Sequence, residues 1–216
     1  MSTEPSSPPL RADAERNRQR LLAAAKELYA TRGLDVTLDE VARHAGVGTG
    51  TAYRRFPNKD ALIEALMVDR IGELAAIASE CLEDPDPWNG LVAYFDRALA
   101  LQAADRGLKD VLFSAGRGRE RVAHARRALG PAVTRLVRRA VEAGVVRSDL
   151  ETSDVPLINF MLNTVVDFGR DVEPQLYRRY LAIVLEGLRP RGDLAPLPVD
   201  ALTIPAFQEA MWRWKA

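Results

Sequence analysis

The chain of 216 residues has one cysteine, two histidines and few aromatic residues. Because Cys81 is the only cysteine, an intrachain disulfide is excluded, which fits a reducing compartment and leads us to expect a cytoplasmic protein. No segment approaches the roughly eighteen uninterrupted apolar residues of a membrane span, and the amino terminus lacks the apolar core of a signal peptide. The formal net charge is zero, so the molecule as a whole does not resemble a polyanion-binding protein.

Motifs of the common enzyme classes are also missing. There is no GxSxG, and the two histidines, His44 and His124, lie in unrelated polar settings. No group of carboxylates and histidines has metal-ligand spacing. Gly46, Gly48 and Gly50 form a GxGxG, but a dinucleotide site also needs a preceding strand and a βαβ unit, neither of which the sequence predicts. We therefore expect no enzyme, no catalytic residue, no metal and no cofactor.

What the chain does contain is helical periodicity almost throughout, which predicts an all-α fold. We expect a disordered tail over 1–13, a helix-turn-helix domain over 14–60, a helical ligand-binding and dimerisation domain over 61–188, and a proline-interrupted segment over 189–216 that ends in a turn. The expected helices cover residues 15–31, 38–45, 49–56, 59–82, 88–104, 108–115, 120–143, 153–169 and 174–188. Pro131 lies inside one of them, so we expect a kink or a break near Gly130.

The most informative segment is TLDEVARHAGVGTGTAYRRFPNK, residues 37–59. Thr37 and Glu40 have the spacing of a capping box, in which hydroxyl and carboxylate each accept a backbone N–H, so a helix is predicted to begin at Leu38. Gly46 ends that helix, because glycine adopts the left-handed conformation at little cost. A second short helix follows after this turn, with Ala52 and Phe56 on its buried side. Two short helices joined so tightly are typical of a helix-turn-helix.

The outward side of the second helix is covered by small, hydrogen-bonding and cationic residues. They are Thr49, Gly50, Thr51, Tyr53, Arg54 and Arg55. The surrounding residues 11–60 contain ten Lys or Arg against seven Asp or Glu. The positive end of the chain is therefore the end that carries the helix-turn-helix.

These residues resemble the DNA-binding signature of the TetR/AcrR family of bacterial repressors, over roughly residues 16–66. The marks are the capping Thr37, Ala42 and Gly46 of the turn, Tyr53 and Phe56 three apart, and Lys59 opening the next helix. The resemblance implies an all-helical homodimer that binds a double-stranded operator and an unknown small-molecule effector. It also implies that Tyr53, Arg55 and Lys59 hold phosphates. Thr49, Gly50, Thr51 and Arg54 are better placed for base edges, and Arg54 could bind guanine bidentately.

Three polar residues, Asn159, Asn163 and Asp167, recur every fourth position along an apolar helix. Buried polar groups need partners, so this stripe could line an effector pocket, fix the register of a dimer interface, or face solvent. Phe95, Phe113 and Met161 are the apolar pocket candidates, and each of them could equally be plain core.

Two functions remain open from the sequence. The first is a repressor released from a palindromic operator by a small molecule. The alternative is a helical enzyme or adaptor that keeps the fold without effector-controlled DNA binding. We expect the last two apolar helices to build the dimer interface through Leu157, Phe160, Val165, Leu181, Val184 and Leu185.

Overall fold

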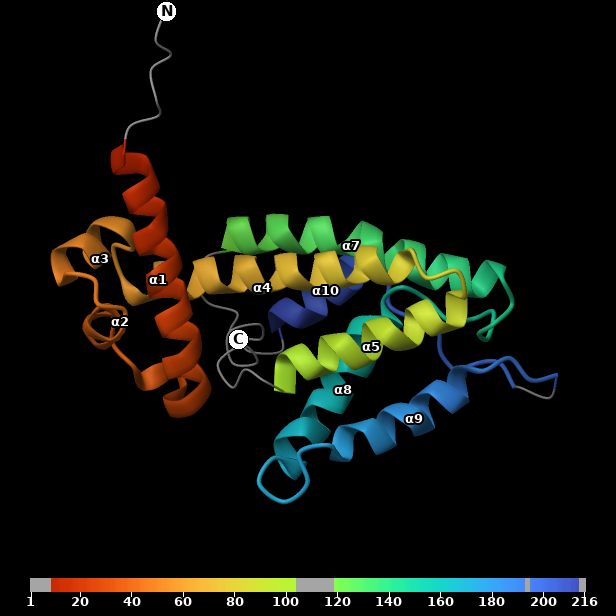
Figure 1. Cartoon of the computed structure of the whole chain (residues 1–216). Helices are drawn as coiled ribbons and strands as arrows, with labels where there is room; N and C mark the ends of the chain where they lie inside the picture. The colour runs from red at the N-terminus through yellow and green to blue at the C-terminus, as the bar shows by residue number, and fades with distance from the viewer. Residues whose placement is uncertain (1–8, 104–118, 193–194, 214–216) are drawn as a thin grey trace, which may run out of the picture.

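Helices make up the regular secondary structure of the chain in the computed structural model, which describes residues 9–103, 119–192 and 195–213 (Figure 1). In order they are α1 (Pro9–Arg32), the 3-10 turn η1 (Gly33–Asp35), α2 (Leu38–His44), α3 (Thr49–Arg55), α4 (Lys59–Leu82), α5 (Pro87–Ala103), α7 (Arg119–Glu142), α8 (Asp154–Gly169), α9 (Leu176–Leu188) and α10 (Ile204–Arg213). The predicted all-α class is confirmed. The helix expected over 108–115, with Phe113, lies outside the described residues.

The first three helices pack into a small lobe around their own core. Leu21, Ala25 and Val41 are completely buried there, together with Ala52 of α3 and Leu62 from the start of α4. In Figure 1 this lobe stands at one end of the molecule, and α2 and α3 lie on its outer side. The short helices α2 and α3 are thus fixed by tertiary packing, because seven residues are too few for a stable isolated helix.

Helix α4 joins this lobe to the larger one. It begins after Asn58, whose side chain accepts from the Ala61 N–H at 2.8 Å. Its first half contributes Leu62 and Leu66 to the core of the small lobe, and its second half contributes Leu74 and Ala78 to the core of the large lobe. The helix runs unbroken between the lobes, with α7 packed along its length (Figure 1).

The large lobe is a bundle of α5, α7, α8 and α9 on the second half of α4. Phe95, Leu99, Leu136 and Val155 are almost fully buried in its core. The helices α8 and α9 pack against each other and form the side of the bundle farthest from α7 in Figure 1. Within the described residues, no helix is long and apolar enough to cross a membrane.

Three helices differ from the sequence-based expectation. Helix α1 begins at Pro9 and not near Glu15, so residues 9–13, which we assigned to a disordered tail, are helical; proline is well suited to a first helical turn, where its missing N–H is not needed. Helix α7 is continuous through Pro131, so the alternative of a break near Gly130 was wrong. Packing along α4 outweighs the loss of one backbone donor. The last segment forms the helix α10, where we expected only a turn.

Candidate nucleic-acid interface

Helix α2 is held at its start by the predicted capping box. The Glu40 N–H donates to Thr37 Oγ1 at 3.2 Å, and the Thr37 N–H donates to Glu40 Oε2 at 2.8 Å. Arg32 reaches the other carboxylate oxygen of Glu40 at 2.6 Å. The hydrogen bond from the Thr37 backbone, followed by that from Arg32, lowers the pKa of Glu40 to about 2. Glu40 is therefore anionic, and the entry of the chain into α2 is fixed.

The turn between α2 and α3 is set by Gly46. Its φ is +62°, in the left-handed region where only glycine is free of strain. This conformation lets the Val47 N–H donate to the Ala42 carbonyl at 2.9 Å and buries the Val47 side chain. The turn thereby fixes the direction in which α3 leaves α2.

Helix α3 buries one side and exposes the other, as predicted. Ala52 and Phe56 point into the core, while Thr49, Gly50, Tyr53, Arg54 and Arg55 are exposed and Thr51 is half-buried. The Arg54 guanidinium donates to Thr51 Oγ1 at 2.9 Å, one turn back on the same helix. The outer surface of α3 therefore combines hydroxyls, a tyrosine and two cations on a short helix, which can enter a DNA major groove.

Arg55 lies at the end of this surface, and a third cation, Lys59, lies just beyond it. Arg55, the last residue of α3, pairs with Glu15 of α1, with 3.3 Å between Nη2 and Oε2. Lys59, the first residue of α4, is half-buried. Analysis of the sequence missed Glu15, because it lies 40 positions from Arg55 and no local periodicity connects them.

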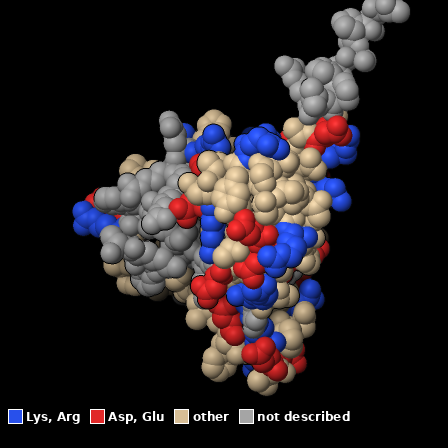
Figure 2. Space-filling view, turned by 90° about the vertical axis from the view of Figure 1, so that its left-hand side faces the viewer, with Lys and Arg blue, Asp and Glu red and all other residues tan. Residues whose placement is uncertain are grey.

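The charge on this side of the molecule is mixed. Figure 2 shows Lys and Arg interleaved with Asp and Glu, with no continuous positive surface. This agrees with the small local excess of cations in residues 11–60. On the face drawn, the cations of the described residues are therefore placed individually and do not form a broad positive field.

Two of the three polar residues that recur along α8, Asn159 and Asn163, face the inside of their own helical bundle. Asn159 and Asn163 are buried, and Asn163 Nδ2 donates to Gln102 Oε1 of α5 and to the Asn159 carbonyl, the latter at 2.8 Å. Asn159 Oδ1 is buried, and none of the described residues donates to it. Gln102 is a member of this cluster that the sequence pattern did not reveal.

The other pocket candidates are not all brought together. Asp167 is half-buried and pairs with Arg170 at 2.6 Å. Phe95 is fully buried in the bundle core. Met161 is 54% exposed. It lies two positions from both Asn159 and Asn163, which turns it to another side of the helix. Phe113 lies outside the described residues.

Large apolar side chains are exposed on α8, α9 and the loop between them. They are Leu157, Met161, Phe168, Val172, Tyr180 and Ile183. Of the residues that we expected at a dimer interface, Leu181 and Leu185 are instead buried in the core of their own bundle. Leu157 is exposed, and Phe160, Val165 and Val184 are half-buried. Among the described residues, no His, Cys, Asp and Glu side chains cluster as metal ligands would.

Comparison with known protein families identifies both lobes. The model for "Bacterial regulatory proteins, tetR family" matches residues 21–66, and the model for "Transcriptional regulator SbtR-like, C-terminal domain" matches residues 86–190. The HTH-type transcriptional regulator SrpR of Pseudomonas putida is 42% identical over 60 residues, which are 27% of this chain and 28% of that protein. The regulator TtgW, also of Pseudomonas putida, is 40% identical over 60 residues, 27% of this chain and 45% of that protein. The chain thus matches less than half the length of these two relatives.

Solved structures match over almost their whole length. A TetR transcription regulatory protein from Mycobacterium vanbaalenii has 33% identity and a TM-score of 0.63, over 84% of this chain and 100% of that one. The TetR transcriptional regulator SCO0520 from Streptomyces coelicolor has 32% identity and a TM-score of 0.60, over 81% and 99%. FadR from Bacillus subtilis shares the fold at 17% identity, with a TM-score of 0.64 over 79% and 99%. The chain belongs to the TetR family of DNA-binding transcriptional regulators.

Proposed function

We propose that the protein is a repressor that binds a palindromic operator as a homodimer and is released by a small-molecule effector. The observation that carries this proposal is the exposed surface of α3, which is covered by hydrogen-bond donors and cations and held in place by the capped α2 and the Gly46 turn. A scaffold of this kind can present a recognition helix to the major groove.

Contacts of two kinds are assigned to this surface. Thr49, Gly50, Thr51 and Arg54 lie on the part of α3 that enters the groove, so they read base edges. Tyr53, Arg55 and Lys59 hold phosphates and fix the register of the helix. Thr37 joins them at the amino end of α2, the helix that crosses the DNA backbone in a helix-turn-helix. The functional division into residues 14–60 for DNA and 61–188 for effector and dimer is part of the same proposal.

The dimer is assigned to the exposed apolar surface of α8 and α9. Phe168 is 83% exposed and Ile183 is 57% exposed, which is costly for a monomer and favourable for a symmetric contact. A two-fold axis here would place two copies of α3 on successive major grooves of a palindrome.

The effector site is assigned to the polar cluster of α8 inside the bundle. Asn159 Oδ1 is buried and receives no hydrogen bond from the described residues, so it is an acceptor that a ligand donor could satisfy. Asn163 is fixed beside it by Gln102, within an otherwise apolar core. The fold accommodates a small molecule in FadR from Bacillus subtilis, whose structure contains stearoyl-CoA. An effector that binds one arrangement of the dimer better than the other would shift the population away from the DNA-binding form.

The decisive experiment is a mobility-shift assay with DNA from upstream of the protein's own gene, next to a shuffled duplex of equal length. We expect a complex with the upstream DNA that survives competition by the shuffled duplex. Equal affinity for both, or no complex, would favour the alternative of an adaptor or enzyme that keeps the fold.

A further inference from the structure

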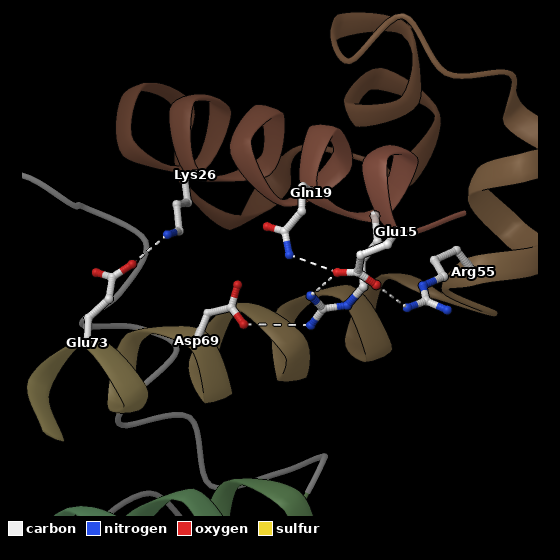
Figure 3. Close-up of polar contacts among 7 residues, drawn as sticks. Glu15, Gln19, Lys26, Arg55, Asp69 and Glu73 are labelled. Carbon is white, nitrogen blue, oxygen red and sulfur yellow. Dashed lines mark hydrogen bonds and ion pairs between the residues drawn. The ribbon is translucent and has the colours of Figure 1, made fainter. Parts of the chain in front are cut away.

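A chain of ionic contacts connects α4 to the recognition helix through α1 (Figure 3). Asp69 of α4 lies 3.6 Å from Arg18 of α1, and the same guanidinium lies 3.4 Å from Glu15. The second carboxylate oxygen of Glu15 lies 3.3 Å from Arg55, at the end of α3. Glu15, together with Arg18, therefore connects α4, the helix that links the two lobes, to Arg55, a side chain that we assign to DNA binding.

Glu15 is held on α1 independently of Arg55. Gln19 donates to its Oε1 at 2.9 Å, and this hydrogen bond, together with the charges of Arg18 and Arg55, lowers the pKa of Glu15. The carboxylate is thus anionic at neutral pH. When Arg55 turns away, Gln19 and Arg18 keep this negative charge in place beside α3.

A DNA phosphate and Glu15 require the same guanidinium. The ion pair between Glu15 and Arg55 is exposed, with 54% and 41% of the two side chains accessible, and solvent screens exposed pairs so that they hold their partners weakly. A phosphate contact also releases condensed counterions, so the phosphate takes Arg55 and the pair is lost. Two effects of Glu15 weaken DNA binding: the ion pair with Arg55 must be broken, and its carboxylate then repels the phosphate. One effect favours binding, because the ion pair orders the Arg55 side chain before DNA arrives.

We propose that Glu15 sets the affinity of the protein for DNA by competing with a phosphate for Arg55, and that Asp69 modulates this competition through Arg18. The inference rests on the proposed phosphate contact of Arg55. It adds that an acidic residue of α1, outside the two short helices α2 and α3, weakens binding to every duplex, whatever its sequence. It also gives the position of α4 a direct electrostatic effect on α3.

The role of Asp69 follows from how Arg18 is shared. With Asp69 present, the charge of Arg18 is divided between two carboxylates. The carboxylate of Glu15 is then neutralised less by Arg18 and attracts Arg55 more strongly than it would without Asp69. A movement of α4 that separates Asp69 from Arg18 leaves Arg18 wholly to Glu15 and frees Arg55 for DNA. Glu73, one turn further along α4, pairs instead with Lys26 at 2.8 Å (Figure 3). It also pairs with Arg70 at 2.5 Å. It therefore provides a matched control on the same helix.

The test measures binding of the full-length protein to a fluorescently labelled random-sequence duplex by anisotropy, at about 50 mM and about 200 mM salt. Glu15→Gln should tighten binding about three- to fivefold at the lower salt and less at the higher salt, because screening weakens exposed charges. Asp13→Asn removes the same charge from α1 at a residue that pairs with Arg16, and should change binding by less than about twofold. Urea unfolding of each variant checks that it is folded.

The pairwise dependence is tested in the background of Arg55→Ala. Glu15→Gln should have no more effect there than Asp13→Asn, because the competition has been removed. Asp69→Asn should tighten binding about twofold, Glu73→Gln should leave it unchanged, and Asp69→Asn should have no effect once Glu15→Gln is present. A purely structural role of Glu15 would weaken binding, so tightening separates the two explanations.

The outcomes also separate this inference from the proposed function. If Arg55→Ala weakens binding but Glu15→Gln does not tighten it, the inference is overturned and the proposed function is not. The inference is overturned as well if Glu15→Gln tightens binding equally in the Arg55→Ala background. Arg55→Ala with wild-type affinity would remove the phosphate contact and the inference together, and a wild-type protein that binds no duplex would overturn the proposed function as a whole.

Discussion

At the level of single residues, Arg54 is the side chain of α3 best suited to read a base. In the free protein it donates to Thr51, so it must exchange that hydroxyl for a guanine edge. Arg54→Ala should cost about 1 to 3 kcal/mol of operator binding and relax the preference at one base pair, because a bidentate contact is lost. The measurement is a binding-site selection from a random pool, repeated with the variant.

Arg54→Lys is the control for charge, since lysine cannot make the bidentate contact. It should keep the affinity for random duplex and lose the base preference. Lys59→Ala should instead weaken operator and random duplex by the same factor and lower the salt slope by about one unit. A selection profile that is unchanged in Arg54→Ala would show that another residue reads the sequence.

The titration of Glu40 gives a second prediction at this scale. Its pKa is lowered from 4.5 to about 2 in the folded protein, so the ionised form stabilises the native state. This contribution is complete above about pH 4.5 and is lost as the pH falls towards about 2. The difference in free energy of unfolding between wild type and Glu40→Gln, measured in urea, should therefore be constant near neutrality and shrink over that acid range.

Asp39→Asn provides the comparison, because Asp39 carries the same charge in the first turn of α2 but is not part of the capping box. The acid-dependent difference due to Glu40 should persist in that background. If it disappears, a general change of charge at the helix start, and not the capping box, is responsible.

At the level of elements, the turn before α3 and the helix itself contain two glycines with opposite requirements. Gly46 has φ +62°, and a Cβ there would meet nothing closer than Arg20 Nη2 at 3.7 Å, so the cost of Gly46→Ala is backbone strain of about 1 to 2 kcal/mol. Gly50 lies within α3, and its Cβ would meet Arg54 Nη1 at 4.0 Å. Gly50→Ala should therefore stabilise the protein by about 0.5 to 1 kcal/mol, as alanine does in helices.

Urea unfolding measures the two effects, and DNA binding separates them further. Gly50→Ala should weaken operator binding although the protein is more stable, because a methyl group is added to the surface that approaches the bases. A stable Gly50→Ala protein with full operator affinity would show that the backbone at this position does not approach the DNA closely.

The helix-turn-helix could be predicted from the sequence because its determinants are local. The Thr37 and Glu40 capping box and the Gly46 turn each depend on residues within a few positions of one another. The continuity of α7 through Pro131 could not be predicted, because packing along a distant helix decides it. Propensity rules act on neighbours in the sequence, and tertiary contacts override them.

The same distinction applies to the candidate sites. The outward residues of α3 follow from helical periodicity alone, and so does the stripe of Asn159 and Asn163. Their partners do not, because Gln102 is 61 positions from Asn163 and Glu15 is 40 positions from Arg55. The exposure of Met161 could not be predicted for a related reason, since a sequence does not show which face of an apolar helix is turned to its own core.

At the level of the whole molecule, the proposed dimer makes a clear prediction. Ile183→Glu would place a charge on the proposed dimer surface, so it should produce a monomer at micromolar concentration and abolish operator binding. Light scattering measures the first effect and a mobility shift the second. Val199→Glu is the control, because Val199 is 77% exposed in the segment after α9 and should leave the dimer intact. A wild-type monomer would count directly against the assignment.

Helix α4 has a further consequence for how the molecule comes apart. It supplies Leu62 to the core of the small lobe, Ile71 to the cluster with α7, and Ala78 to the core of the large lobe. Neither core can lose its packing without exposing part of the same 24-residue helix, so melting of one lobe removes support from the other. The protein should therefore unfold in a single calorimetric transition whose enthalpy equals the van't Hoff enthalpy, although the proposed DNA and effector sites lie in different lobes.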